Sequence, residues 1–291
     1  MSARLLQLAT GGVVGMTTLG DPAAQHTVLL CHPTPGASGF DPDPVITGQR
    51  SVRIVSADRP GYGASSPRIS PLAEPHLAEL AVLDELTGAG ARIDAVIGWG
   101  YGGLIALRVA AERPDAIARV ALVQTAAPKN RLHDIVIRRT RAWIPQHRDP
   151  LRARAALLGG TRIKALSLLG AGDEDEALRL SGTEQRCERM LDQAVAQGEA
   201  GIEFDRRALH RGGWAPAARS LRARTLVLYG ARDKRLGPSD AKWFARRLPH
   251  PHVEVIAETA AMTIASDWAR VLDFATGDTV TSPTAADAAH E

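Results

Sequence analysis

Cysteine is scarce in this chain: its 291 residues include only Cys31 and Cys187, which lie far apart in the sequence. Two isolated cysteines supply neither a disulfide framework nor the ligand spacing of a zinc site, and no cofactor or metal is expected. The chain also lacks the run of roughly 18 apolar residues that a membrane-spanning helix needs, and its first residues lack the apolar core of a signal peptide. We therefore expect a cytoplasmic protein with no membrane partner.

A strong excess of charge is missing as well. The formal net charge is +3, which is too weak to indicate a nucleic-acid partner. Much of the excess lies between Arg131 and Arg154, where arginines alternate with aliphatic residues. This stretch is interpreted either as amphipathic helices with a solvated basic face or as a basic rim that guides an anionic or carrier-bound acyl substrate. The acidic residues 173–176 are expected to form a solvated loop.

Strand-length and helix-length patterns alternate along the chain, which predicts an α/β fold with a mostly parallel sheet flanked by helices. Several predicted strands are continuous apolar runs, as in strands buried on both faces. The predicted strands are Leu5–Leu8, Val13–Leu19, Thr27–Cys31, Val52–Ala57, Ala95–Gly98, Val120–Gln124, Thr225–Tyr229 and Val253–Ile256. The predicted helices are Pro71–Leu86, Tyr101–Glu112, Pro238–Leu248 and Ile264–Phe274.

One segment interrupts this alternation. Residues 128–221 are rich in arginine, leucine and alanine and are predicted to form a helical cap inserted between two strands. Residues 1–127 and 222–275 are then the core, whose length suits one large α/β domain. Residues 276–291 lack apolar periodicity and are predicted to be a disordered tail.

The most informative motif lies in residues 92–107, where a short apolar strand, a glycine-dense turn and an apolar helix follow one another. This is the arrangement of a nucleophile elbow, G-x-S-x-G, in which a serine occupies a sharp strand-to-helix turn. The middle position here is Gly100, flanked by Gly98 and Gly102. The sequence thus predicts the frame of a serine hydrolase without its nucleophile. Glycine either relaxes the strained turn or makes space for a ligand or a water molecule.

The glycines Gly98, Gly100 and Gly103 also match the dinucleotide fingerprint G-x-G-x-x-G. That fingerprint normally opens the first strand–helix–strand unit and is followed by an acidic residue at the end of the next strand. The next predicted strand ends at Gln124 and Thr125, without a carboxylate. Nucleotide binding is therefore the weaker interpretation.

Four motifs occur in a fixed order, each after a predicted strand. They are His32–Gly36, Asp58–Ser65, Gly98–Gly103 and Tyr229–Asp233. In this order they resemble the HG-x-P-G segment, the D-x-x-G-x-G-x-S loop, the nucleophile elbow and the acid loop of the α/β-hydrolase family. The resemblance covers residues 1–275, and the segment from Gln197 to Trp214 resembles a capped, actinobacterial-type branch. It implies an α/β-hydrolase fold with an inserted helical cap.

The resemblance also implies where the catalytic groups would lie. Asp233 matches the acid of the triad, whereas Gly100 and Ala261 occupy the positions of the serine and the histidine. Since the serine must give its proton to a base, acyl-enzyme chemistry by that route is not expected. The oxyanion-hole donors would be the backbone N–H groups of Thr34 and Tyr101, which do not depend on the missing side chains.

The remaining candidate residues have two interpretations each. Asp233 is either a general base or a leftover carboxylate that caps its loop or pairs with an arginine. His32 either orients its loop or contacts a ligand. A small-molecule ligand is expected between core and cap, where aromatic side chains would line a pocket or serve as ordinary packing. The aromatic candidates are Trp99, Tyr101, Trp143 and Trp214.

Several functions stay open. The first is a non-hydrolytic enzyme of the isomerase, lyase or cyclase type, acting in specialised metabolism on a small carbonyl compound through the oxyanion hole and Asp233. The second is a pseudo-hydrolase that binds a ligand or a protein partner without turnover. The third is an atypical hydrolase with displaced catalytic residues, and the fourth is an engineered inactive variant. The sequence does not indicate the oligomeric state.

Overall fold

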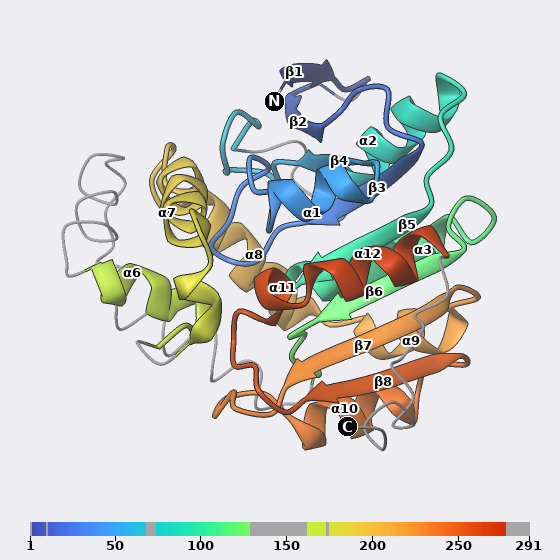
Figure 1. The fold of residues 1–291 in the computed structure, drawn as a ribbon. Coiled ribbons are helices and arrows are strands. Elements are labelled where there is room, and N and C mark those ends of the chain that lie inside the picture. The colour runs from blue at the N-terminus through green and yellow to red at the C-terminus, as the bar shows by residue number, and fades with distance from the viewer. Residues whose placement is uncertain (1, 10, 68–73, 129–161, 173–174, 278–291) are drawn as a thin grey trace.

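A computed structural model describes residues 2–9, 11–67, 74–128, 162–172 and 175–277. Trp143, the basic stretch from Arg131 to Arg154 and the predicted tail beyond residue 277 lie outside these ranges. In the described residues, one eight-stranded sheet carries helices on both faces (Figure 1). The predicted class, a mostly parallel sheet flanked by helices, is confirmed.

The sheet has the strand order β1-β2-β4-β3-β5-β6-β7-β8. The pairs β1–β2 and β2–β4 are antiparallel, and the pairs from β4 onward are parallel. The strands are β1 (Ser2–Gln7), β2 (Val13–Gly20), β3 (His26–Cys31), β4 (Val52–Ala57), β5 (Ala95–Trp99), β6 (Arg119–Val123), β7 (Arg224–Gly230) and β8 (Pro251–Ile256). Every residue of β5 is buried, which explains an apolar sequence without alternation.

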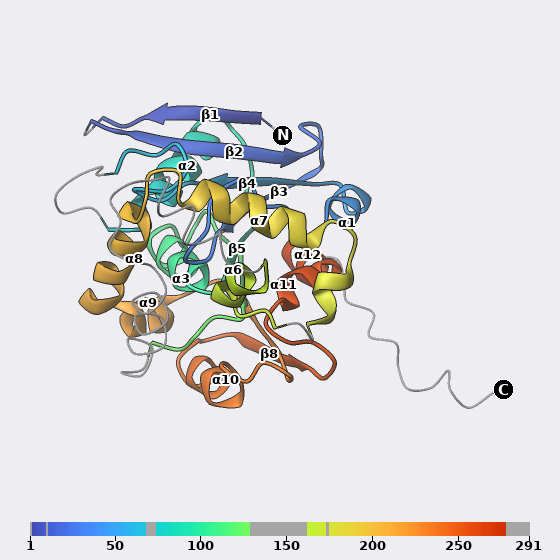
Figure 2. The same cartoon turned by 90° about the vertical axis from the view of Figure 1, so that its left-hand side faces the viewer.

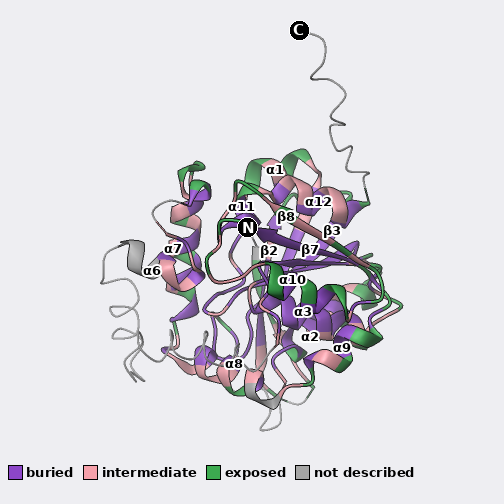
Figure 3. Cartoon of the chain, turned by 90° about the horizontal axis from the view of Figure 1, so that it is seen from below, coloured by how far each residue is buried: buried purple, intermediate pink, exposed green. Residues whose placement is uncertain are grey.

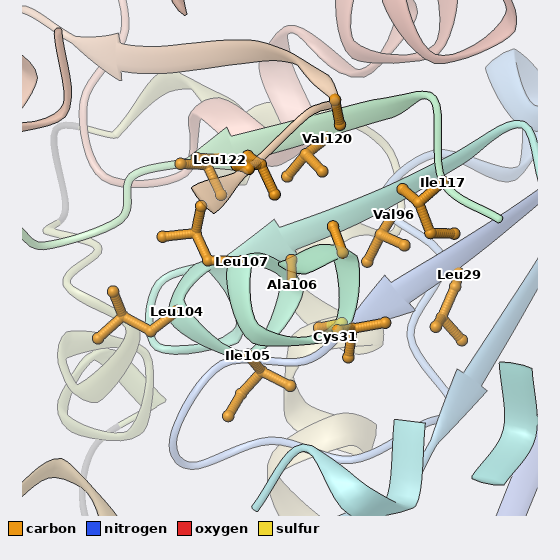
Figure 4. Packing of buried hydrophobic residues seen from close by; sticks show 14 of the residues in the cluster. Leu29, Cys31, Val96, Leu104, Ile105, Ala106, Leu107, Ile117, Val120 and Leu122 are labelled. Atoms are coloured by element: carbon orange, nitrogen blue, oxygen red, sulfur yellow. The ribbon is translucent and has the colours of Figure 1, made fainter. Parts of the chain in front are cut away.

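Two hydrophobic clusters fill the space between the sheet and its helices, one on each face. The first face carries α2 (Leu77–Gly88), α3 (Gly102–Glu112), α9 (Trp214–Ser220) and α10 (Pro238–Ala245). The second face carries α1 (Pro44–Gln49), α11 (Thr263–Ser266) and α12 (Trp268–Thr276). Figure 4 shows buried side chains of the first cluster, among them Leu104 and Leu107 of α3 and Val96 and Val120 of the sheet. Each such buried aliphatic side chain contributes about 1.5–3 kcal/mol to stability.

Between β6 and β7 the described part of the cap segment contains α6 (Arg162–Leu169), the short 3-10 helix η1 (Glu176–Arg179), α7 (Thr183–Ala194) and α8 (Ala200–Arg211). In Figure 2 these helices lie over the carboxyl ends of the parallel strands. Leu166 of α6 and Met190 of α7 share the second cluster with Trp99 at the end of β5. α9 packs against α3 in the core.

Some helices differ from the sequence prediction. The predicted helix Ile264–Phe274 is two helices, α11 and α12, because the backbone leaves helical geometry at Asp267. The helix predicted to end at Leu248 ends at Ala245. The short α1 was not predicted, although Asp43 followed by a proline is a capping signal. The Asp43 carboxylate accepts hydrogen bonds from the backbone N–H groups of Val45 and Ile46.

Burial follows the layers (Figure 3): buried residues face the sheet, and exposed residues lie on the outer sides of α1 and α10. No helix in the described ranges combines the length and apolar character needed to cross a bilayer.

Candidate functional site

The turn between β5 and α3 has the backbone geometry expected of a nucleophile elbow. Gly100 has a φ of +59°, in the left-handed region. Its N–H donates to Val123 O over 3.0 Å, and its carbonyl accepts from Gly103 N over 3.2 Å. These bonds fix the middle residue of the turn between the end of β6 and the first turn of α3.

The glycines of this turn are not equivalent. A Cβ atom at Gly98 would lie 2.3 Å from Gly102 O, one at Gly102 would lie 2.1 Å from Cys31 O, and one at Gly103 would lie 1.9 Å from a side-chain oxygen. At Gly100 the nearest atom would be Pro33 Cβ at 3.4 Å, an ordinary contact. The first three glycines are required by close packing, whereas position 100 has room for a side chain and carries none.

Thr34 and Tyr101, the predicted oxyanion donors, lie on the two segments that meet at Gly100. The contacts of Pro33 with position 100 and of Cys31 O with position 102 bring these segments together. In the described ranges, neither the Thr34 N–H nor the Tyr101 N–H donates a hydrogen bond to a protein acceptor. Pro33, which stands where the family has a glycine, has no N–H to offer. Two backbone donors therefore remain available beside an empty side-chain position.

Asp233 lies in the loop after β7 with its side chain only 2% exposed. Its carboxylate accepts from the Gln124 side-chain amide at 2.8 Å, from Arg235 N at 2.7 Å and from Leu236 N at 3.4 Å. The Arg235 guanidinium adds contacts at 3.2 and 3.3 Å. The carboxylate is thus fully engaged by protein donors, as in the interpretation in which it pairs with an arginine.

Gln124, directly after β6, was not predicted to belong to the site. Besides Asp233, its amide nitrogen contacts Ala260 O at 2.9 Å, and its amide oxygen accepts from Gly230 N at 3.1 Å. Its φ of +48° is unusual for a residue with a side chain. Ala261, the predicted histidine position, follows Ala260 and is buried. The available signal was a glutamine directly after an apolar strand, but the sequence does not indicate its partners.

Asp175 holds the loop that carries Ala261. One of its carboxylate oxygens accepts from Met262 N at 3.0 Å, and the other accepts from Ala177 N at the start of η1. Burial raises the pKa of this carboxyl, while these backbone donors oppose the shift. The expectation of a solvated acidic loop over residues 173–176 was wrong at Asp175, which is 2% exposed because it caps one segment and anchors another.

His32 directly follows β3 and precedes Pro33 and Thr34. Its Nδ1 is 2.8 Å from Pro33 O, and its Nε2 accepts from Arg59 N at 3.4 Å. Burial and the nearby Arg59 charge hold the pKa of this imidazole well below its ordinary value. Both ring nitrogens are engaged by backbone groups, which supports a role in orienting the loop.

The tryptophans do not gather in one place. Trp99 lies in the second hydrophobic cluster and stacks on Phe40, with ring centroids 5.3 Å apart. Trp214 lies in the first cluster, edge-on to the Tyr101 ring at 5.9 Å. The two are on opposite faces of the sheet, and Trp143 lies outside the described residues. Among the described side chains, no group of His, Cys, Asp and Glu has the arrangement of a metal site.

The sequence of this chain is similar to those of known proteins. A sequence profile of the Alpha/beta hydrolase family matches residues 28–274. The chain is 32% identical over 200 residues to a pimeloyl-[acyl-carrier protein] methyl ester esterase of Chromobacterium violaceum, covering 66% of this chain and 70% of that protein. It is 30% identical over 215 residues to the polyketide synthase ThaQ of Burkholderia thailandensis, covering 72% of this chain and 10% of the synthase.

A solved structure shares the fold. The enol-lactonase of Burkholderia xenovorans LB400 superimposes with a TM-score of 0.66 at 18% identity, covering 94% of this chain and 100% of the lactonase. With the profile match, the strand order and the elbow all in agreement, this chain belongs to the alpha/beta hydrolase family.

Proposed function

We propose that this protein binds the carbonyl group of a small acyl compound through the backbone N–H groups of Thr34 and Tyr101, without forming an acyl-enzyme. The observation that carries the proposal is the pair of unpartnered donors beside Gly100, a position with room for a side chain but no nucleophile. Such preorganised donors stabilise negative charge on a carbonyl oxygen. A carbonyl held there would meet no serine oxygen.

The surroundings of Asp233 favour binding over turnover. Its carboxylate contacts Gln124, Arg235 and a backbone N–H, and its side chain is almost fully buried. A general base needs a lone pair directed at the substrate proton, and here protein donors occupy the oxygens. We therefore favour a pseudo-hydrolase that binds its ligand over a non-hydrolytic enzyme.

The second candidate, an isomerase, lyase or cyclase type of enzyme, is supported by the retained elbow backbone. A pair of donors that polarises a carbonyl also stabilises an enolate, so proton transfer next to the carbonyl would be assisted. Asp233 would act as the base only after releasing one of its present partners. This candidate predicts product formation, whereas the first predicts binding alone.

The ligand class is inferred from the relatives. One relative is named as an esterase of an acyl-carrier-protein methyl ester and another as a polyketide synthase. Their names support an ester or a thioester as the bound compound. A shared fold alone does not establish a shared substrate, so the inference depends on the donors as well.

The test compares the wild-type chain with Gly100→Ser/Ala261→His on short p-nitrophenyl esters. We expect no release of p-nitrophenol above the buffer rate from the wild type, and turnover from the double variant. Gly100→Ala/Ala261→His is the matched control, because it fills position 100 without an oxygen. Titration of the wild type with ethyl butyrate, followed by calorimetry and by product analysis, should show saturable binding with no product. Ester turnover by the wild type would overturn the proposal.

A further inference from the structure

A buried arginine joins the oxyanion loop to the cap segment. Arg59, in the loop after β4, has a fully buried side chain. One terminal nitrogen donates to His32 O at 2.8 Å. The other donates to Pro33 O and to Thr34 Oγ1, both at 3.0 Å. A single guanidinium therefore holds three consecutive residues of the segment that carries the Thr34 backbone donor.

The partner of this arginine comes from the cap segment. Asp205 of α8 is fully buried and accepts from Arg59 Nε at 3.0 Å and from a terminal nitrogen at 2.7 Å. The same carboxylate accepts from the hydroxyl of Thr34 and from Tyr62 OH, the latter at 2.9 Å. Asp205 thus contacts the oxyanion loop twice, directly at Thr34 and through Arg59.

The start of α8 packs closely against the loop after β4. A Cβ atom at Gly61 would lie 2.5 Å from Gly201 N, and one at Gly201 would lie 2.6 Å from the Tyr62 ring. Gln197 reinforces the contact, because its amide donates to the carbonyls of Tyr62, Gly63 and Ser65. The start of α8 has little freedom to shift without moving the loop after β4.

Charge in this region is balanced by Asp205. Burial acts to lower the pKa of Arg59, but the Asp205 carboxylate outweighs it and the pKa is raised. Glu79 lies 3.8 Å from the same guanidinium, yet burial raises the pKa of its carboxyl to about 8. Glu79 is then largely protonated at neutral pH, so Asp205 supplies the counter-charge that keeps Arg59 in place.

We propose that Asp205 is a positioning residue: from the cap it sets the place of the Thr34 N–H by holding the Thr34 hydroxyl and Arg59. This deepens the proposed function and rests on it, since the N–H matters only if it binds a carbonyl. The consequence is that docking of α8 and ligand binding at Gly100 are coupled. A fixed donor binds more tightly than one that must be ordered on binding.

The test uses variants that keep the backbone N–H. Thr34→Val removes the hydroxyl at nearly constant shape, and Thr34→Ser restores a hydroxyl. Tyr62→Phe is the matched control, because it removes a different bond to Asp205 and keeps the bonds from the Thr34 hydroxyl and from Arg59 to that carboxylate. Asp205→Asn is the direct variant, but it leaves a buried arginine without a counter-charge and is judged only if it folds.

Two readouts are measured. The first, without ligand, is backbone hydrogen exchange over residues 32–38, which we expect to rise about tenfold in Thr34→Val, as loss of a hydrogen bond to a charged group predicts. The second is titration with ethyl butyrate, observed through the amide signals of Thr34 and Tyr101. We expect the Thr34 response to be lost and the dissociation constant to rise about fivefold, within the range for one hydrogen bond. Thr34→Ser and Tyr62→Phe should resemble the wild type.

Each outcome decides a separate point. Unchanged exchange in Thr34→Val overturns the positioning role, as does an equal increase in Tyr62→Phe, which would indicate general loosening. If exchange changes as expected but the wild type does not bind ethyl butyrate, the positioning role stands and the proposed function fails for this ligand class.

Discussion

The side-chain amide of Gln124 donates to Asp233 Oδ2 over 2.8 Å. The same amide reaches Ala260 O, next to Ala261, and its oxygen accepts from Gly230 N. One side chain therefore ties together the end of β6 and the loops after β7 and β8. The Asp233 carboxylate therefore already has a neutral partner.

This contact predicts that efficient ester hydrolysis requires a third change beyond Gly100→Ser/Ala261→His. Gly100→Ser/Ala261→His should show weak esterase activity, because the new imidazole competes with Gln124 for Asp233. Adding Gln124→Ala should raise kcat by about tenfold or more, within the usual contribution of an oriented general base. The measurement is steady-state hydrolysis of p-nitrophenyl butyrate. The triple variant with alanine in place of serine at position 100 is the control, and equal rates in the double and triple variants would contradict the prediction.

The glycines of the elbow should differ in their tolerance of a side chain. Gly100→Ala is expected to lower the free energy of unfolding by about 1–2 kcal/mol, since only its positive φ is unfavourable. Gly102→Ala should cost about 3 kcal/mol or prevent folding, because its Cβ would overlap Cys31 O. Urea denaturation of both variants checks this difference. Similar values for the two would mean that the turn adjusts more freely than its contacts indicate.

Asp233→Asn distinguishes a structural carboxylate from a base. Because the carboxylate pairs with Arg235 and accepts from backbone N–H groups, its loss should lower the free energy of unfolding by about 2 kcal/mol or more. Thermal and urea denaturation measure the change. A variant as stable as the wild type that has lost a product-forming activity would instead favour the non-hydrolytic enzyme and a catalytic Asp233.

Glu79 predicts a pH dependence of stability. Its pKa is about 8 in the folded protein against an ordinary value of 4.5. Between pH 4.5 and about 8 the folded state keeps a proton on Glu79 that the unfolded state has lost. The contribution of Glu79 to the free energy of unfolding is therefore fully present below pH 4.5 and is lost as the pH rises through about 8. The slope approaches about 1.4 kcal/mol per pH unit within that window.

The check is a comparison with Glu79→Gln, which keeps the shape of the side chain and does not titrate. Urea denaturation of both chains across this window isolates Glu79, because contributions of the buried histidines cancel in the difference. We expect the stability of the wild type to fall relative to the variant as pH rises. Parallel curves would contradict the assignment of a protonated Glu79.

The sequence determined the features that depend on local pattern. Continuous apolar runs indicated strands buried on both faces, and the loop Asp58–Ser65 was identified from its resemblance to a family motif: in the structure Gly63 has a φ of +47° beside the Asp58 carboxylate. The elbow was likewise predicted from its glycines. Features formed by residues close together in the chain can be predicted from local sequence patterns.

Only the tertiary structure decided which partners the site residues have. Gln124 and Asp233 are 109 residues apart, and Arg59 and Asp205 are 146 apart. No spacing or periodicity relates residues at such separations. The parallel pairing of β6 with β7 and the packing of α8 on the loop after β4 bring them together. The sequence therefore predicted an elbow without a nucleophile, while the folded chain determined that the Asp233 carboxylate is engaged by protein donors and that Thr34 is held by Asp205 of α8.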